Sequence, residues 1–293
     1  MTFLENIDKA NLKKIMLVVI SVLTLVALAL LLVIIVMSID PSSPAVPDTL
    51  KESKEYTVTD KDINTGSLIL ADNDHPYSYA FSDDELKVCG EYRSANIEKD
   101  ANGNSINKYY MNDMSGMKLT NDAMAAAHKM LTAAEAAIGE DELCIDSTYG
   151  LDEESKGERK EYATAQLIYL ARIISSTAPN EKLGTSYANW LDAHAAEFGF
   201  IESFENGYRY VGTVHAANIA GNAMINSLAD YITYLKENTA YNKMLKTTLN
   251  GVEYAVYYVP CKAGDTIQIP VDGTAVISGT NEGGVIVTVD MSK

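Results

Sequence analysis

The sequence predicts a mixed α+β protein with an N-terminal transmembrane helix and a C-terminal tail of β-strands. An uncharged apolar run occupies residues 15–39, helical periodicity follows between residues 120 and 237, and from Val252 onward apolar residues recur with a period of two. The expected organisation is a cytoplasmic tail (1–14), a transmembrane helix (15–39), a linker (40–59), a folded ectodomain (60–240) and a β-rich tail (250–293).

The apolar run contains no charged residue, Gly or Pro, and it exceeds the roughly 20 residues that a helix needs to span a bilayer. Three Lys precede the run and Asp40 follows it, which predicts a cytoplasmic N-terminus. A cleaved signal peptide is the alternative, but its apolar core would be shorter, and residues 38–41 form a poor cleavage site. We therefore expect a single-pass protein of the cell membrane, anchored through residues 15–39, with an extracellular C-terminal domain.

The predicted exterior part carries almost all of the charge. The formal charge of the whole chain is -17, and the segment before the anchor contributes +1 from three Lys, Glu5 and Asp8, so -18 remains for the rest. Such a surface repels nucleic acid and anionic lipid headgroups, and no nucleic-acid partner is expected. It predicts a hydrated ectodomain, or alternatively a surface that attracts cationic partners.

The elements expected along the exterior part follow from composition and periodicity. The Pro-rich residues 41–47 indicate a semi-extended linker. Strands are expected at 67–70, 143–145, 252–260, 266–271, 274–278 and 285–290, and helices at 120–139, 158–176, 190–198 and 214–237. For the first helix, Thr120 is the expected N-cap and Gly139 the expected stop.

The cysteine content predicts no disulfide framework. Cys89, Cys144 and Cys261 are odd in number and widely spaced, so at most one bridge could form. Cys144 lies in an apolar run and is expected to be a buried small hydrophobe.

The segment from Trp190 to Ala216 carries the most specific pattern. Trp190-Leu191, Phe198–Ile201, Arg209–Gly212 and His215-Ala216 occur in the order found at the end of the catalytic core of zinc D-alanyl-D-alanine carboxypeptidases of the VanY type, which are LAS-type metallopeptidases. In that family a WL…A..YGFI helix-turn leads through a strand hairpin into an EPWH.RYVG..HA motif. Here the RYVG and HA are present, whereas the EPWH is absent and the hairpin is expected to be missing.

Two further segments are similar to elements of VanY-like proteins. Residues 66–77 resemble a G.LILVN..HPY element, and the end of the tail resembles an ISG.N..G.IVTV pattern. The resemblance covers roughly residues 64–236. It implies a D-Ala-D-Ala carboxypeptidase-like α+β fold in which helices pack on a small antiparallel sheet.

A zinc carboxypeptidase needs three protein ligands, an open position for water, a carboxylate base and a cation for the substrate's C-terminal carboxylate. The resemblance implies an Arg clamp in an SGYRS turn. Here Ser147 and Tyr149 match that motif, but Gly150 stands in place of the Arg. A second candidate, Arg93, precedes the first helix instead of following it, and is expected to be an ordinary surface Arg.

The resemblance implies a His and an Asp ligand in a second motif, S.H..G.A.D. Residues 178–189 fit the surrounding pattern and place Lys182 at the His and Asn189 at the Asp. A protonated Lys has no lone pair for a metal, and an Asn oxygen is a weak zinc ligand. Shifting the alignment by one residue puts Glu181 at the His but Ala188 at the Asp, so the site is not restored.

The third motif implies a Glu base and a His ligand. Counting back from Arg209 places Gly207 at the His and Phe204 at the Glu, whereas a gapped alignment removes the whole hairpin. The four His residues offer no replacement, because no two of them are spaced i,i+3 or i,i+4. They are His75, His128, His194 and His215.

These losses predict a membrane-anchored, extracytoplasmic pseudo-D-Ala-D-Ala carboxypeptidase that binds a cell-wall peptide or protein without catalysis. No cofactor and no catalytic or metal-binding residue is expected, and zinc is expected only if the motifs are misaligned. An ammonium at Lys182 would pair with a carboxylate, or Lys182 simply faces solvent. The residues expected to contact a ligand are Ser147, Tyr149, Lys182, Asn189 and Arg209.

The expected partners are a peptidoglycan stem peptide or another envelope protein. Two other functions stay open: an active zinc D-Ala-D-Ala carboxypeptidase that acts on stem peptides, and a structural assembly subunit bound through the β tail or the anchor.

Overall fold

The computed structural model describes residues 52–106, 108–139, 142–150, 160–174, 180–271 and 273–292. The chain divides into two compact units, Met1–Ala45 and Val46–Lys293, and all described residues belong to the second. The predicted cytoplasmic tail, transmembrane helix and Pro-rich linker lie outside the described residues. Within those described ranges, no helix combines the length and apolar character needed to cross a membrane.

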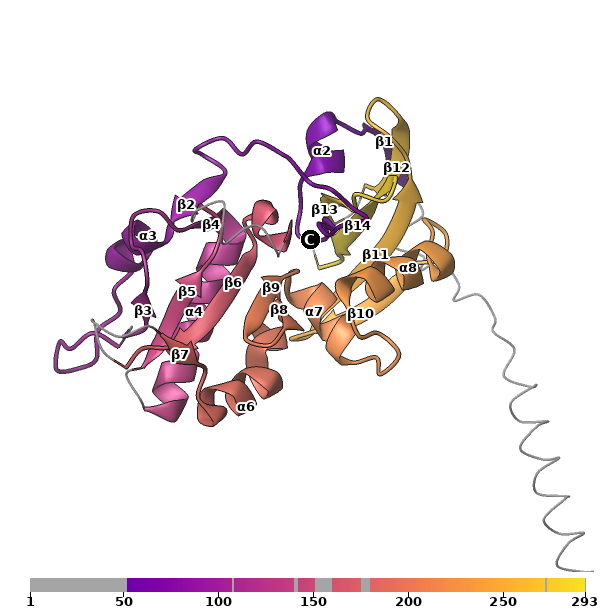
Figure 1. Cartoon of the computed structure of the whole chain (residues 1–293). Helices are drawn as coiled ribbons and strands as arrows, with labels where there is room; N and C mark the ends of the chain where they lie inside the picture. Colours follow the sequence, from indigo (N-terminus) through magenta and orange to yellow (C-terminus); the bar gives the residue numbers. More distant parts are fainter. Residues whose placement is uncertain are drawn as a thin grey trace, which may run out of the picture. The chain divides into compact units, whose positions relative to one another are not determined.

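The folded domain contains a six-stranded mixed sheet, here called the central sheet, with the order β3–β5–β6–β9–β8 and with β7 paired to β6 (Figure 1). Its strands are β3 (Tyr110–Met111), β5 (Leu143–Ser147), β6 (Leu167–Arg172), β7 (Glu181–Lys182), β8 (Phe200–Phe204) and β9 (Gly207–Tyr210). The β3–β5 pair is parallel and the other pairs are antiparallel. The sheet is therefore larger than the small antiparallel sheet that we expected, and it is mixed.

Among the described residues, the helices are short apart from one. They are α2 (Asp60–Asn64), α3 (Cys89–Ala95), α4 (Asn121–Ile138), α6 (Thr185–His194), α7 (Thr213–Ala220) and α8 (Leu228–Asn238), with 3₁₀ turns η2 (Lys160–Thr164) and η3 (Ala195–Phe198). The expected first helix is confirmed as α4, which follows Thr120 and ends at Gly139 in the left-handed conformation, with a φ of 77°.

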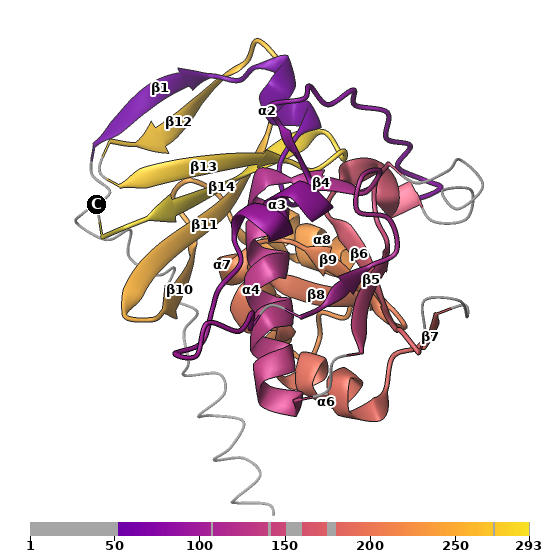
Figure 2. The same cartoon turned by 90° about the vertical axis from the view of Figure 1, so that its left-hand side faces the viewer.

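The two faces of the central sheet have different surroundings. Side chains alternate along a strand, so Ile168 and Tyr208 lie on one face, with Leu167 and Arg209 on the other. The first face packs with α4 in the main core cluster, and Figure 2 shows α4 running along the sheet. The second face carries Lys182 and Gly207, two of the three positions of the VanY-like ligand motifs.

The C-terminal residues form a second, four-stranded sheet of order β10–β11–β14–β13. Its strands are β10 (Leu245–Leu249), β11 (Val252–Pro260), β13 (Thr274–Gly279) and β14 (Gly284–Asp290). Val256 and Ile286 pack in one cluster with α7 and α8, while Tyr257 and Val287 pack in another on the opposite face. Because both faces are covered, the tail is a layer of the folded domain rather than an appendage.

Two pairs of short strands complete the fold. They are β1 (Ser53–Thr57) with β12 (Thr266–Pro270), and β2 (Leu86–Val88) with β4 (Lys118–Thr120). The end of the expected linker thus forms a strand, β1, because its backbone pairs with a strand of the tail. All four predicted tail strands are confirmed to within one residue at each end.

Three other expectations differ from the structure. The helix expected at 158–176 is instead η2 followed by β6, with Ala165 at a positive φ of 53° between them. The helix expected at 214–237 is two helices, α7 and α8, separated after Ala220. Residues 67–70 form no strand. Leu68 N–H donates to Ser278 Oγ at 2.9 Å, and Leu70 N–H donates to the Thr280 carbonyl oxygen at 3.1 Å.

Candidate functional site

Two of the three expected ligand positions lie close together on the second face of the central sheet. Lys182 on β7 is opposite Ala171, and Gly207 on β9 is opposite Tyr169. Both therefore lie along the same edge of β6, opposite two β6 residues that are two positions apart in the sequence. The resemblance implies a metal site here, and the side chains at these positions decide whether a metal could bind.

Lys182 forms an ion pair at the surface. Its Nζ donates to both carboxylate oxygens of Glu205 at 2.9 Å, and the two side chains are 72% and 71% exposed. The hydrogen bond from Lys182 to Glu205 raises the pKa of the ammonium, so Lys182 stays charged and has no lone pair for a metal. Lys182 thus pairs with a carboxylate of this chain and also faces solvent.

Gly207 is buried, and an aromatic ring occupies the space where its side chain would extend. A Cβ at Gly207 would approach the ring of Phe204 to 2.2 Å. That ring stacks on Tyr169, with the centroids 6.2 Å apart and the planes 18° apart. A ligand side chain at position 207 would therefore need Phe204 to move.

The strand hairpin that we expected to be missing is present in a short form. β8 and β9 pair from Phe200 with Tyr210 to Phe204 with Gly207. The turn contains Asn206 at a positive φ of 63°, a conformation that Asn tolerates better than most residues. The hairpin thus survives without the EPWH residues.

Asn189, the third expected ligand position, lies on the exposed side of α6. The buried side of that helix carries Tyr187 and Leu191, two residues before and after it. Since residues two apart on a helix point in roughly opposite directions, Asn189 faces away from the core.

Ser147 lies in the same row as Tyr169 and Gly207, because Ser147 pairs with Tyr169 across the sheet. Beside this row, Asn180 Nδ2 donates to Asp146 Oδ1 at 2.5 Å. Sequence reasoning missed this pair, although Asp146 directly follows the strand predicted at 143–145.

Tyr149 lies beside the sheet, with its ring edge-on to Phe81 at 5.7 Å. Gly150, at the position of the family's clamp Arg, has a φ of 99°, and a Cβ there would approach the carbonyl oxygen of Gly116 to 2.2 Å. This backbone therefore accepts only glycine. The other candidate, Arg93, lies on α3 with its guanidinium 5.3 Å from the ring centroid of Tyr109.

Arg209 is fully buried, which corrects our expectation that it contacts a ligand. Its guanidinium donates to the carbonyl oxygen of Ile69 at 3.2 Å, to Gln166 Oε1 at 3.2 Å and to Thr164 Oγ1. Burial lowers the pKa of Arg209 to about 10, so it remains charged at neutral pH. The residue holds the 67–70 segment against the sheet, which is a structural role.

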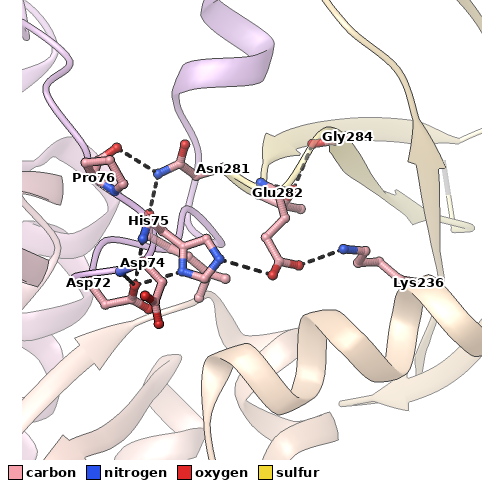
Figure 3. A network of polar contacts seen from close by, with 10 residues as sticks. Asp72, Asp74, His75, Pro76, Lys236, Asn281, Glu282 and Gly284 are labelled. Atoms are coloured by element: carbon pink, nitrogen blue, oxygen red, sulfur yellow. Dashed lines mark hydrogen bonds and ion pairs between the residues drawn. The ribbon is translucent and has the colours of Figure 1, made fainter.

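His75 joins three elements in a polar network shown in Figure 3. Its Nδ1 lies 2.8 Å from Asp72 Oδ1 and its Nε2 lies 3.1 Å from Glu282 Oε1, while Lys236 Nζ donates to Glu282 Oε2 at 2.9 Å. Nearby, Asn281 Nδ2 donates to the carbonyl oxygens of Leu70 and Pro76. The His of the HPY element therefore links the C-terminal strands to the rest of the folded domain.

The other three histidines have separate environments. His128 Nδ1 lies 2.8 Å from the hydroxyl of Tyr109, and His194 Nδ1 lies 2.9 Å from Glu197. His215 is buried between the Tyr231 hydroxyl at 3.0 Å and Thr288 Oγ1 at 2.9 Å, and burial lowers its pKa to about 4.

Cysteine chemistry adds no site. All three cysteines are free thiols, and Cys144 is buried as predicted. Burial raises the pKa of Cys144 to about 12, which suppresses the reactive thiolate form.

The residues at the ligand positions do not fit a zinc ion. Zinc in a peptidase site takes three side chains with lone pairs, and Lys182 and Gly207 supply none. Over the described ranges, no three His, Cys, Asp or Glu side chains are grouped so that they could hold a metal.

Comparisons with known proteins agree with this architecture. No protein-family model matches the chain. A D-alanyl-D-alanine carboxypeptidase of Enterococcus faecium is 23% identical over 262 residues, which cover 82% of this chain and 80% of that protein. The crystal structure of the vancomycin resistance D,D-dipeptidase VanXYg, in complex with a D-Ala-D-Ala phosphinate analog, superimposes with a TM-score of 0.60 at 18% identity over 82% of this chain and 99% of that one.

Together these similarities support the resemblance found in the motifs. Over most of its length the chain is similar in sequence to a D-alanyl-D-alanine carboxypeptidase and shares the fold of a D,D-dipeptidase.

Proposed function

We propose that the protein is a membrane-anchored, extracytoplasmic pseudo-D-Ala-D-Ala carboxypeptidase that binds a cell-wall peptide without cleaving it. The observation that carries the proposal is the Phe204 ring, which occupies the space beside Gly207 where the resemblance implies a zinc-binding His. Lys182, paired with Glu205, gives the second ligand position a cation in place of a metal donor.

Several polar groups on the same face support peptide binding. Ser147 lies in the row with Tyr169, and Asp146 with Asn180 flanks it. Exposed ion pairs contribute little to stability, so a peptide carboxylate could replace Glu205 as the partner of Lys182 at small cost. The related proteins are named for D-Ala-D-Ala peptidase activity, so a stem peptide ending in D-Ala-D-Ala is the first ligand to test.

The proposed location depends on residues 15–39 and on the charge of the remainder. The uncharged apolar run follows a basic flank, which favours a cytoplasmic N-terminus. The remaining charge of -18 suits a hydrated domain outside the membrane and argues against nucleic acid as a partner.

The test pairs a reaction with a binding measurement. The purified chain is incubated with a synthetic stem pentapeptide ending in D-Ala-D-Ala, with and without added zinc, and released D-Ala is quantified by chromatography. We expect no release, and we expect calorimetry to show binding that weakens when the C-terminal carboxylate is replaced by an amide.

Two outcomes would overturn the proposal in different ways. Release of D-Ala that a chelator abolishes would favour the active zinc carboxypeptidase. Absence of binding at millimolar peptide would favour the structural assembly subunit.

A further inference from the structure

The outer edge of β8 is a second candidate binding site, separate from the face that carries Lys182. β8 is the last strand of the central sheet, and within the described part of the chain no strand pairs with its outer edge. An edge strand of this kind presents backbone donors and acceptors to any extended chain that approaches it.

The register shows which backbone groups point outward. Tyr210 N–H donates to the Gln166 carbonyl on the β6 side, at 2.9 Å, whereas Val211 N–H donates to the Gly199 carbonyl on the β8 side, at 2.8 Å. The N–H and C=O of successive residues alternate between the two neighbours of an antiparallel strand. Phe200 and Glu202, opposite Tyr210 and Tyr208, therefore direct their backbone groups away from β9.

A groove of about 320 Å³ runs along this edge. One wall comes from α6 and η3, with Leu191 and Ala195, and the other comes from the end of α7 and the residues after it, with Ile219 and Ile225. The edge of β8 from Phe200 to Glu202 lies between the two walls. An extended segment in this groove would add a strand to the sheet and place a side chain among apolar groups.

The acidic residues that line the groove favour peptides with basic side chains. Its lining includes the carboxylates of Asp192 and Glu202, both exposed, and its described residues include no Lys or Arg. At its mouth, Ala223 is exposed, and the next residue, Met224, is 81% exposed, the most exposed large apolar side chain in the described chain. A flexible, unburied Met is typical of surfaces that adapt to a bound peptide.

We infer that this groove, which we name the β8 groove, binds an extended peptide segment by strand addition. The segment carries a small apolar side chain for the cavity and flanking basic side chains for Asp192 and Glu202. Strand addition supplies main-chain hydrogen bonds, while the cavity and the carboxylates supply specificity. This site does not depend on the proposed function, because it uses neither Lys182 nor the row beside Gly207.

The test uses the full-length chain in detergent and an acetylated, amidated Lys-Val-Lys-Val-Lys peptide. Binding is measured by calorimetry and by the fluorescence of Trp190, the single Trp of the chain and the neighbour of Leu191 in the groove wall. We expect saturable binding that weakens as salt is raised, because the carboxylates are exposed.

Two altered peptides separate the contribution of the main-chain hydrogen bonds from that of the charged side chains. Methylation of alternate backbone nitrogens removes the donors needed for strand pairing, and a Glu-Val-Glu-Val-Glu peptide reverses the charge. Each is expected to bind at least about tenfold more weakly, in line with the loss of one or more charge-assisted or main-chain hydrogen bonds.

Matched variants locate the site on the protein. Ala223→Arg places a cation and a long side chain at the mouth of the groove and is expected to abolish binding. Ala101→Arg makes the same change at an exposed loop position elsewhere, and Lys182→Ala alters the other site, so both are expected to bind normally.

The inference is overturned if the Lys-Val peptide shows no binding at millimolar concentration, if the N-methylated peptide binds as well as the parent, or if Ala223→Arg behaves like Ala101→Arg. Failure of the stem peptide to bind would leave this result unchanged, so the two proposals fail separately.

Discussion

Arg209 and Lys182 lie on the same face of the central sheet, but they differ in burial and in the partners of their hydrogen bonds. Arg209 is fully buried, and side-chain and backbone oxygens accept its hydrogen bonds. Lys182 is exposed and has one exchangeable partner, Glu205. Folding requires the first arrangement, because a buried polar group without a partner is costly, whereas it places little demand on the second. The fold can therefore keep the RYVG scaffold while the residues at the ligand positions change.

The largest expected effect is at Arg209. Arg209→Met leaves Gln166 and the Ile69 carbonyl without their donor in a buried site, so we expect a loss of about 3–5 kcal/mol in the free energy of unfolding. Urea denaturation followed by circular dichroism measures it. Lys182→Met, the matched control on the same face, is expected to leave the midpoint unchanged. Equal midpoints for the two variants would contradict the contrast between the two regions.

His215 is expected to make the fold sensitive to acid. Its pKa in the folded protein is about 4, below the unfolded value of 6.5, so the unfolded state binds more protons between these values. The stability that His215 contributes is thus present above pH 6.5 and lost as the pH falls toward 4, by at most about 3 kcal/mol. Urea titrations at pH 7 and pH 4 should show a smaller decrease for His215→Gln than for the parent. A similar decrease in both proteins would show that other groups control the acid transition.

Restoring a His at position 207 tests whether the Phe204 ring closes the site. Gly207→His forces Phe204 out of its stack with Tyr169, so we expect a loss of about 1–3 kcal/mol in stability. In the background of Phe204→Ala the same substitution is expected to cost less, because the space is then open. A double-mutant cycle measures this coupling. Additive effects would mean that the ring does not occupy the space of the side chain.

His75 is expected to have a smaller effect with the opposite sign to that of His215. Burial lowers its pKa, but the hydrogen bonds to Asp72 and Glu282 outweigh burial and raise the pKa above 6.5. The raised pKa means that its contribution is present below pH 6.5 and is lost as the pH rises through the folded value. In thermal unfolding, the stability of the parent should decrease between pH 6 and pH 8. This decrease should be smaller in His75→Asn, by up to about 1 kcal/mol. If the variant had the same pH profile as the parent, the protonation of His75 would not contribute to the docking of the tail.

The elements with simple periodicity could be predicted from the sequence, and those defined by distant partners could not. The strands of the tail and α4 follow directly from apolar spacing. β6 is buried on both faces, so its near-continuous apolar run has no period of two and resembles a helix. β1 pairs with β12, and Ser53 lies opposite Pro270, a partner too distant in the sequence for local patterns to indicate.

The structure brings two of the three expected ligand positions together, whereas the third, Asn189, faces away from the core. The motif order brought Lys182 and Gly207 to one edge of β6, as the resemblance implies. The position of the Phe204 ring depends on the bulge in β8 between Glu202 and Phe204, which no local pattern reveals. Arg209 was expected at a groove because it follows a catalytic motif in the family, but its place on the sheet buries it.

The zinc content of the purified chain tests the central claim most directly. The protein is equilibrated with buffered zinc, separated from unbound metal by gel filtration and analysed by mass spectrometry, with an active zinc D-Ala-D-Ala carboxypeptidase as the positive control. Since Lys182 and Gly207 supply no donor at two ligand positions, we predict far less than one zinc per chain. One tightly held zinc per chain would contradict the pseudoenzyme and restore the active carboxypeptidase as the function.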